Sequence, residues 1–530
     1  MHSNAARTSH ASDREGAGVL RTLSLSMSWP RLVLLVSAAA VVVLAFWRLD
    51  LFPLTWFDEG SHLHVPKALV RYGVYADYSS EGFRYFGPTT GVGPTVMLPI
   101  AGSFAAFGVG LWQARLIIAF YLLGCTAAMY GLARSLGGSR FAWVATALLV
   151  ASRGAPFLEY GRQVLGEVPA LFFMICGLGA WFASWSRPTA VRLALAGSLF
   201  GLAMVTKQQF LIVLAPTLGF AWLANQLYYR AAPQRVFLVP AVIAVGLYAA
   251  WQATLILLLS PAPVAESLAL LQRAAGGAAM TFSPPLIERS IRELLDAKVY
   301  LGALTPGLIY AGFLTRSRTT ESLRWAILFG LVMVNLAWYV LGSVSWLRYA
   351  FPALAVSVLL IGKLFQDWTQ DFRLRREGSR GQPADAPSGT SWPLRWAALG
   401  WLAMMILVPL GQTVRQIAEK SFDAPVAMAE YVNARVPESA IIETWEPEMG
   451  FLTDHAYHYP PEELLATAVA YIWRGGPPPS ESYDFVQQQT PPFVLVGEFA
   501  RWVDVYPGAV LDEKYRLVVT IGGYELYERR

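Results

Sequence analysis

Two adjacent acids and two histidines lie in the segment TWFDEGSHLHV (55–65), directly after the first long apolar run of the sequence. The carboxylates of Asp58 and Glu59 could act as a general base, ligate a metal ion or cap a short helix. His62 follows Asp58 by four residues, so on a helix the two would share a face and could bind a divalent cation together. No further motif supports a metal site, so none is assigned and His62 is only a secondary ligand candidate.

Three more charged residues lie at the ends of apolar segments. Glu167 begins such a segment in EYGRQVLGEVPALFF, and a carboxylate drawn toward a bilayer centre costs roughly 2.5–3.5 kcal/mol, so it is usually paired or functional. An ion pair with Arg162 and a functional role are both open. Lys207 in GLAMVTKQQF and Arg348 in SWLRYAFP could each simply snorkel. Two cations beside carboxylates, however, are what a bound phosphate needs.

A loop rich in glycine and proline follows, EGFRYFGPTTGVGPTVMLP (81–99). Its glycines at 87, 91 and 93 could serve turn geometry alone, or let backbone amides approach a phosphate or sugar closely. Both interpretations are open from the sequence.

The composition identifies the elements that must position these residues. Hydrophobic residues make up 55% of the chain and charged residues only 15%, which is too little charge to cover a soluble protein of this length. The net charge of +5 resides in short loops between apolar runs, so it does not indicate a nucleic-acid partner. The two cysteines lie inside apolar segments and offer neither a disulfide framework nor a metal site.

The sequence therefore predicts a polytopic α-helical membrane protein with about eleven transmembrane helices. The predicted spans are 30–48, 112–133, 140–158, 168–185, 191–206, 208–227, 236–258, 299–315, 324–343, 349–366 and 394–412. Segment 94–110 is short and contains two prolines, and it is interpreted as juxtamembrane. Only then do all the arginine-rich loops fall on one side, which marks the cytoplasmic face, and all the chemically unusual segments on the other.

Three parts of the chain are expected. Residues 1–29 are a disordered cytoplasmic N-terminus, residues 30–412 a transmembrane domain with an outer loop at 49–111, and residues 413–530 a small extracytoplasmic α/β domain. In that domain a helix is predicted at 424–436, strands at 439–445 and 492–497, and a hairpin at 515–529. The segment 444–460, with Glu446, Glu448, His455 and His458, either faces the site or is an ordinary polar loop. Residues 373–391 read as a flexible cytoplasmic linker.

The motifs, taken in order, resemble a family. An Asp-Glu pair after the first span, then GPTTGVGPTVMLP, YGRQVLGEVPALFF, GLAMVTKQQF and WLRYAFP are similar to the GT-C polyprenyl-phosphate-dependent glycosyltransferases of the protein O-mannosyltransferase and aminoarabinose-transferase-like group. The resemblance covers about 30–366, and the tail resembles the outer domain of many members. It implies a GT-C fold, no cofactor and no required metal, a polyprenyl-phosphate-linked sugar as donor, and a lipid, glycan or protein acceptor.

The resemblance also implies site residues. Asp58 matches the general base and Glu59 its partner, Glu167 matches a second acid, and the departing phosphate would be held by Lys207 and Arg348, with Arg84. The other substrate-binding candidates are Tyr85, Arg162, Gln208 and Tyr349. Attack opposite the phosphate would invert the anomeric carbon. Many relatives carry a lysine before the prolines of the juxtamembrane segment, which GVGPTV lacks, so Arg84 or backbone amides are the substitutes.

Other functions remain open. A lipid-linked glycan ligase or polymerase would use the same donor chemistry, and a transporter or flippase of a lipid-linked saccharide is the alternative from a different class. Transporters place coupling residues near the midplane in broken helices, whereas here the acids gather at one face. A catalytically inactive scaffold would not need Asp58 and Glu59. Spans rich in alanine and leucine, with arginine preferred over lysine, favour a prokaryotic plasma membrane.

Overall fold

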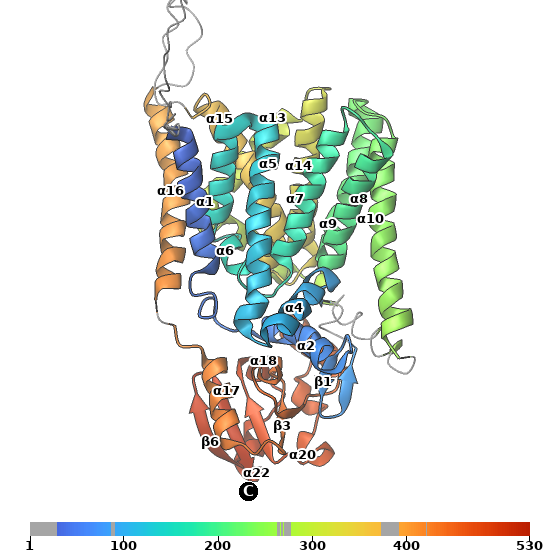
Figure 1. Cartoon of the computed structure of the whole chain (residues 1–530), viewed down its shortest axis with the longest axis vertical. Helices are drawn as coiled ribbons and strands as arrows, with labels where there is room; N and C mark the ends of the chain where they lie inside the picture. Colours follow the sequence, from blue (N-terminus) through green and yellow to red (C-terminus); the bar gives the residue numbers. More distant parts are fainter. Residues whose placement is uncertain are drawn as a thin grey trace, which may run out of the picture.

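The computed structural model describes residues 29–85, 91–261, 265–266, 269, 277–372, 392–419 and 421–530. Long helices stand side by side in a bundle, and a smaller domain containing a sheet lies at one end of it, at the bottom of Figure 1. We call this part, residues 421–530, the sheet domain. The predicted linker 373–391, Gly87 and all but the last residue of the predicted N-terminal segment 1–29 lie outside the described residues.

The bundle is built from apolar helices. Seven helices of the described chain are long and apolar enough to cross a membrane, so the chain is a multi-pass membrane protein. The bundle helices are α1 (Trp29–Phe46), α5 (Leu111–Ala151), α7 (Glu167–Ser184), α8 (Ala190–Thr206), α9 (Gln209–Ala224), α10 (Arg235–Thr254), α13 (Leu304–Leu314), α14 (Thr320–Gly342), α15 (Phe351–Trp368) and α16 (Trp392–Ala418). Short turns η1 (Asn225–Tyr229), η2 (Leu255–Leu259), η4 (Tyr300–Gly302) and η5 (Leu347–Ala350) extend or connect them.

The predicted spans map onto these helices. Two of them, 112–133 and 140–158, lie in α5, where two helices meet at Gly138; its φ of 83° and ψ of −177° are not helical, and glycine adopts this conformation without strain. Three others appear as shorter apolar helices, namely α8, α13 and the described part of α1. Helix α15 is mostly buried in the bundle whereas α10 is mostly exposed, so α15 is central and α10 faces lipid.

Small residues let two bundle helices pack closely. A Cβ atom on Gly197 of α8 would lie 2.8 Å from the carbonyl oxygen of Pro240, and one on Gly201 would lie 2.9 Å from Leu247. These two glycines are one helical turn apart and face α10. Glycines at this spacing allow close helix contact in lipid, where association depends on van der Waals packing.

Several short elements lie between the bundle and the sheet domain. They are α2 (Phe57–Tyr72), the hairpin of β1 (Asp77–Ser79) and β2 (Gly82–Arg84), α4 (Pro94–Phe107), α6 (Phe157–Tyr160) and α12 (Pro284–Leu295). Figure 1 shows α2 and α4 below the upright helices and next to the sheet domain. Helix α2 begins after Trp56, and no side chain caps its start, so the interpretation of Asp58 as a helix cap is wrong.

The sheet domain contains α17 (Ala424–Arg435), β3 (Ile441–Thr444), α18 (Pro447–Leu452), β4 (Ala456–His458), α19 (Leu464–Arg474), η6 (Pro479–Glu481), α20 (Phe485–Gln488), β5 (Phe493–Val496), α21 (Glu498–Trp502), α22 (Gly508–Lys514), β6 (Tyr515–Ile521) and β7 (Tyr524–Arg529). The strand order is β4-β3-β5-β7-β6, with β3 parallel to β4 and β5, and β7 antiparallel to β5 and β6. The predicted helix, two strands and hairpin are all present.

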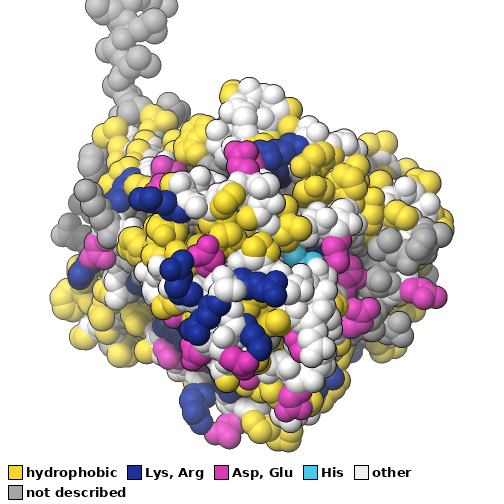
Figure 2. Space-filling model, turned by 90° about the horizontal axis from the view of Figure 1, so that it is seen from below, with side chains coloured by type: hydrophobic (Ala, Val, Ile, Leu, Met, Phe, Trp, Pro, Cys, Tyr) yellow, Lys and Arg dark blue, Asp and Glu magenta, His cyan; other side chains and the backbone are white. Residues whose placement is uncertain are grey.

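The two parts differ in what they expose. Seen from below in Figure 2, the sheet-domain end carries basic and acidic side chains interspersed over its face. The outer helices of the bundle instead expose large apolar side chains, including Val242 and Leu257 of the α10–η2 segment and Leu407 of α16. Apolar exposure of this kind suits a hydrocarbon environment, and mixed charge suits water.

Candidate active site

Four consecutive residues at the start of α2 face four different parts of the molecule. The ring of Phe57 packs on Phe499 of the sheet domain, with centroids 3.9 Å apart. Asp58 forms an ion pair with Arg348, and Glu59 forms one with Arg115 of α5. A Cβ atom on Gly60 would lie only 2.3 Å from the Cα atom of Glu448, so this glycine allows α18 to lie directly on α2. Because a helix turns by about 100° per residue, one short stretch joins bundle and sheet domain.

Arg348 lies at the centre of a cluster of four charges. Its guanidinium donates to Asp58 Oδ2 and, through Nε at 2.5 Å, to Glu167 Oε1. The ammonium of Lys207 lies 3.5 Å from the same Glu167 oxygen. The structure thus brings together four site residues proposed from the sequence, which lie far apart along the chain. The cluster has two acids and two cations, and its net charge is zero.

Four successive residues, 162–165, form hydrogen bonds that hold the segments around this cluster in place. Arg162 donates to backbone carbonyls at the end of α1, including Trp47 O at 2.7 Å, and Gln163 donates to Leu54 O at 2.9 Å. The amide of Val164 donates to Glu59 Oε1 at 3.1 Å. The carbonyl of Leu165 accepts from Lys207 Nζ at 2.8 Å. Most of the polar motif before α7 therefore holds other site elements in place.

Arg162 itself does not reach the cluster. It is fully buried, and its guanidinium donates to the carbonyl groups of Leu44, Trp47, Arg48 and Phe52. The alternative of an Arg162–Glu167 ion pair is wrong, because Glu167 pairs with Arg348 and Lys207 instead. The position of Arg162 also contradicts direct substrate binding by this residue.

Glu59 is likewise structural in this arrangement. Its two carboxylate oxygens accept from Arg115 at 2.9 and 2.6 Å, and both side chains are fully buried. Arg115 also donates to Leu49 O at 3.0 Å. Such a buried ion pair, with its hydrogen bonds satisfied, fixes the position of its two side chains relative to each other. Glu59 therefore positions α2, and its location does not support the direct catalytic contact expected from the sequence.

Asp58 is held as an anion. Burial raises the pKa of its carboxyl group, but Arg348, and further the neighbouring His62 and Lys207, lower the pKa to about 2. About 29% of its side chain is exposed, so water or a substrate hydroxyl can reach it. A carboxylate that is ionised, rigid and accessible can accept a proton.

The pKa values of Lys207 and His62 are lowered as well, which for these basic groups favours the neutral form. Burial lowers the pKa of Lys207, and Glu167 only partly offsets this. Burial and Lys207 lower the pKa of His62 to about 4, so its imidazole is neutral at pH 7. Its Nδ1 donates to Val164 O at 2.7 Å. No group of three His, Cys, Asp or Glu side chains in the described part of the chain could hold a metal ion.

The remaining candidates lie around the cluster. Arg84 pairs with Asp77 and stacks on the ring of Tyr459 at 4.3 Å, so it faces the sheet domain. Tyr85 is half-buried just after β2, and Gln208 is half-buried before α9. Tyr349 follows Arg348 and stacks against Trp346, with centroids 6.1 Å apart. Among the described residues, no hydrogen bond or ion pair joins Tyr85, Gln208 or Tyr349 to Asp58 or Glu167.

A cavity of about 1000 Å³ lies between the bundle and the sheet domain. Its membrane wall includes Arg348, Tyr160 and Gln163, so the charge cluster opens onto it through Arg348. Its sheet-domain wall includes Glu446, Glu448, Glu498, Phe499, Trp502 and Tyr524. The volume is large enough for a substrate of several rings.

Glu446 and Glu448 were left undecided by the sequence, and the structure puts both acids on the cavity wall. The two histidines of the same segment point elsewhere: His458 pairs with Glu443, and His455 contacts Val436 O at 3.1 Å. The spacing of these acids and histidines in the sequence does not predict which of them line the cavity, because α18 reaches the cavity only by packing on α2.

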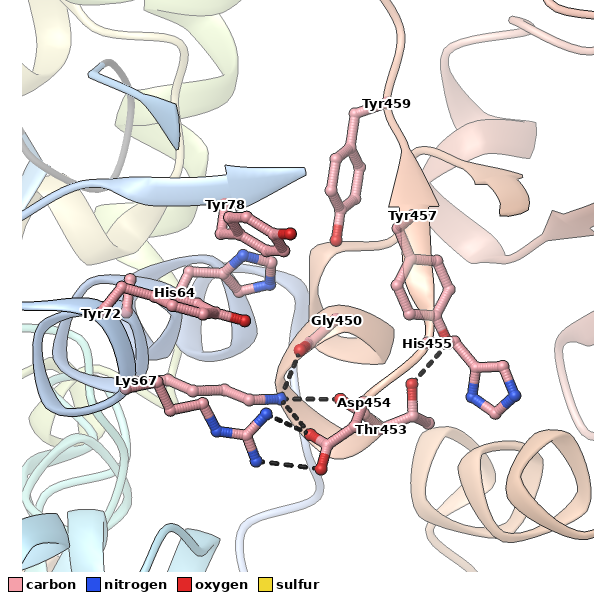
Figure 3. A pocket seen from close by; sticks show the side chains of 12 residues that line it. His64, Lys67, Tyr72, Tyr78, Gly450, Thr453, Asp454, His455, Tyr457 and Tyr459 are labelled. Atoms are coloured by element: carbon pink, nitrogen blue, oxygen red, sulfur yellow. Dashed lines mark hydrogen bonds and ion pairs between the residues drawn. The ribbon is translucent and has the colours of Figure 1, made fainter. Parts of the chain in front are cut away.

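Lys67 holds α18 against α2. Its ammonium donates to the carbonyl groups of Gly450, Phe451 and Thr453 at 2.8, 3.0 and 2.7 Å, as Figure 3 shows in part. These carbonyls belong to the end of α18, where backbone acceptors lack partners within the helix. Lys67 also lies 3.0 Å from Asp454. Burial lowers the pKa of Lys67 to about 8.

Comparison with known proteins supports the fold and the resemblance. Residues 35–260 match the family model described as dolichyl-phosphate-mannose-protein mannosyltransferase. ArnT from Cupriavidus metallidurans, solved with undecaprenyl phosphate, is similar with a TM-score of 0.65 and 14% identity over 93% of this chain and 97% of that one. Its apo structure gives a TM-score of 0.61 at 15% identity, covering 94% of this chain and 97% of that one.

The oligosaccharyltransferase AglB from Archaeoglobus fulgidus, solved with an inhibitory peptide and a dolichol-phosphate, has a TM-score of 0.58 at 14% identity and covers 95% of this chain and 74% of that one. No curated protein matches the chain by sequence. The chain thus has the GT-C fold, and the fold class and the resemblance inferred from the sequence are confirmed.

Proposed function

We propose that the chain is an inverting glycosyltransferase that moves a sugar from a polyprenyl-phosphate donor to an acceptor in the cavity beneath the bundle. The observation that carries this is the cluster of Asp58, Arg348, Glu167 and Lys207 opening onto that cavity. The family match over 35–260, and similar folds solved with undecaprenyl phosphate and with dolichol-phosphate, support this class of donor.

The chemistry follows from the charges. The bond from the anomeric carbon to the phosphate oxygen breaks, and the acceptor oxygen forms a new bond from the opposite face. Asp58 takes the acceptor proton as general base. Arg348 and Lys207 stabilise the negative charge that develops on the departing polyprenyl phosphate. The phosphate is already a good leaving group, so no strong general acid is needed.

Arg348 links the two halves of this reaction. Arg348 is hydrogen-bonded to both Asp58 and Glu167, which holds the proton acceptor at low basicity. A phosphate in the cavity competes for the same guanidinium, and its arrival makes Asp58 a better base. Glu167 then keeps Arg348 and Lys207 in position. Tyr349 and Gln208, which adjoin these cations in sequence, together with Arg84 and Tyr85, are the proposed additional substrate contacts.

The orientation is part of the same proposal. Helix α7 begins at Glu167 in the cluster and ends at Ser184, so Arg187 and Arg192 lie at the opposite end of the bundle. Arginine-rich connections favour the cytoplasmic side, which puts the cluster and the sheet domain on the extracytoplasmic side and the N-terminus in the cytoplasm. The composition favours a prokaryotic plasma membrane.

The test compares the full chain in detergent with its Asp58→Asn variant, using radiolabelled polyprenyl-phosphate sugars as donors. Release of free polyprenyl phosphate and transfer to added lipids, glycans or peptides are both scored. We expect turnover by the wild type and a loss of at least about 10²-fold in the variant, the lower range for removing a general base. Asp512→Asn, an exposed acid on α22, is the matched control and should retain full turnover.

Binding of donor without turnover in either protein would contradict a transferase and favour a transporter of lipid-linked saccharide. Equal turnover in wild type and Asp58→Asn would leave the transferase and remove Asp58 as its base.

A further inference from the structure

The sheet-domain wall of the cavity carries two carboxylates that the proposed reaction does not use. Glu446 is 1% exposed and Glu448 is fully buried, yet both line the cavity. Glu446 Oε1 accepts from the amide of Ala500 at 2.8 Å, and Glu448 Oε1 accepts from the hydroxyl of Tyr524 at 2.5 Å. None of these hydrogen-bond partners is a cation, in contrast to those of Asp58 and Glu167.

One oxygen of this pair accepts no hydrogen bond from an N–H group or a hydroxyl. Glu448 Oε2 is buried without such a donor among the described residues, and the neighbouring carboxyl group of Glu446, when protonated, can donate to Glu448. One proton shared by two carboxylates leaves acceptor capacity unused, so the pair is an expected contact point for a ligand in the cavity. Glycines leave the space for these acids: a Cβ on Gly497 would lie 2.5 Å from Glu446 Cδ, and one on Gly523 would lie 2.6 Å from Glu498 Oε1.

Aromatic rings stand beside these acids. Trp502 exposes 43% of its surface and lines the cavity, and it stacks on Trp346 with centroids 5.9 Å apart and an interplanar angle of 26°. Phe499 packs against Trp502 and also lines the cavity. Trp346 is two residues before Arg348, so the aromatic group extends from the charge cluster to the sheet domain.

We propose that this wall, formed by Glu446, Glu448 and Trp502 opposite Arg348, binds a carbohydrate portion of the acceptor, so that the acceptor is a glycan or glycan-bearing molecule. That the bound carbohydrate belongs to the acceptor rests on the proposed function. The binding of carbohydrate to this wall can be measured without any donor.

The chemistry of a sugar matches both features of the wall. The axial C–H groups of a pyranose form an apolar face with partial positive charge, and the face of an indole ring carries the complementary negative charge. The hydroxyl groups at the rim of the same sugar donate and accept hydrogen bonds. Burial, and then the neighbouring Glu448, raise the pKa of Glu446, so the pair can hold a proton and both donate and accept.

A cationic or purely apolar acceptor fits less well. An ammonium group would be bound best by two ionised carboxylates, and the raised pKa of Glu446 opposes that state. An alkyl chain would offer no hydrogen-bonding group to Glu448 Oε2, which accepts from no N–H group or hydroxyl of the described residues. The hydroxyl groups of a sugar can donate to that oxygen while its ring covers Trp502.

The test is binding of the labelled full chain in detergent to an array of microbial glycans, with no donor present. Wild type is compared with Glu448→Gln and Trp502→Ala. We expect wild type to bind a defined set of glycans, and each variant to bind them at least about 10-fold more weakly. Glu513→Gln on α22 and Trp396→Ala on α16, both exposed, are the matched controls and should bind like wild type. Melting temperature in detergent shows whether each variant is folded.

Trp502→Ala keeps the test decisive if Glu448→Gln does not fold, because Trp502 is partly exposed. Absence of glycan binding by folded wild type overturns the inference, and so does equal binding by wild type and the two variants. Transfer from donor to a peptide or a sugar-free lipid, without glycan binding, overturns it and leaves the transferase in place. Glycan binding that the variants lose, without donor turnover, supports this subsite and contradicts the proposed function.

Discussion

The two sides of the cavity hold carboxylates whose pKa values shift in opposite directions. On the membrane side, Asp58 and Glu167 do not line the cavity themselves but share the guanidinium of Arg348, which does, and the pKa of Asp58 is lowered to about 2. On the sheet-domain wall, Glu446 and Glu448 are hydrogen-bonded to an amide and a phenol, and burial raises the pKa of both. Burial alone favours the protonated form, and only a nearby cation reverses this.

This difference agrees with the separate tasks that we propose for the two walls. In the proposed reaction, the membrane wall supplies an anion that accepts a proton and cations that bind a phosphate. The proposed glycan subsite on the sheet-domain wall offers a neutral polar ligand both a proton and an acceptor. The two walls are joined at Gly60, where α18 packs on α2.

The largest effect is expected from substituting Arg348, the cation that lowers the pKa of Asp58 on the membrane side and has no counterpart among the described hydrogen-bond partners of Glu446 and Glu448. Arg348→Ala leaves Asp58 without its ion pair and removes a contact to the departing phosphate, so kcat/KM should fall by about 10²–10³-fold or more. Arg348→Lys should recover part of it, since a point charge remains. Steady-state transfer assays measure both, and activity of Arg348→Ala within tenfold of wild type would contradict the role of Arg348.

The next largest effect is expected at Gly60, where α2 and α18 are in contact. Gly60→Ala adds a methyl group where Glu448 Cα would lie 2.3 Å away, so α18 must shift and the free energy of unfolding should fall by about 1–3 kcal/mol. Thermal melting in detergent measures this. Gly102→Ala in α4 is the control, because nothing lies within 4 Å of its added Cβ and it should melt like wild type. An unchanged melting temperature for Gly60→Ala would show that the walls are not in direct contact there.

A smaller effect is expected from titrating the sheet-domain wall. The folded-state pKa of Glu446 lies above its ordinary value of 4.5, so folding retains a proton that the unfolded chain releases as pH rises. The stability is full below pH 4.5 and declines as pH rises from there toward the raised pKa, by about 1.4 kcal/mol per unit of pKa shift. Melting temperatures from pH 5 upward should therefore fall less steeply in Glu446→Gln than in wild type, and parallel curves would contradict the assignment.

The smallest effect is expected on the membrane wall over the same pH range. The pKa of Asp58 is about 2 in the free enzyme, so its carboxylate stays ionised and is protonated only as pH falls toward 2. The profile of kcat/KM should show no acidic limb from Asp58 between about pH 5 and 8, because kcat/KM reports the free enzyme. In Arg348→Gln, burial is no longer offset by the guanidinium, and a limb should enter this range from the acid side.

Much of the architecture was predictable because it depends on local composition. The apolar runs predicted the bundle, and the strands and hairpin of the sheet domain followed from short apolar stretches between turns. The spans 112–133 and 140–158 were predicted separately, and within α5 two helices meet at the non-helical Gly138. Strand β4 was missed because its three residues lie in a polar segment and are defined by pairing with β3.

The site was predictable only in part. Asp58, Glu167, Lys207 and Arg348 were proposed from residue type and position at span ends, and the fold brings them into one cluster. Glu59 and Arg162 have equally suitable chemistry, yet one is bonded to Arg115 and the other to backbone carbonyls, both fully buried. Residue type alone does not distinguish a charge that faces a cavity from one that joins helices.

By itself, the sequence determined that this protein is a helical membrane protein with a small α/β tail and its charges at the ends of its spans, because hydropathy and local periodicity act over a few turns of chain. The tertiary structure alone decided that Asp58 and Glu167 pair with Arg348 while Glu59 pairs with Arg115, and that Glu446 and Glu448 line the same cavity as Arg348. Those outcomes depend on contacts between residues hundreds of positions apart, whose energies are set by burial and by partners that no local pattern encodes.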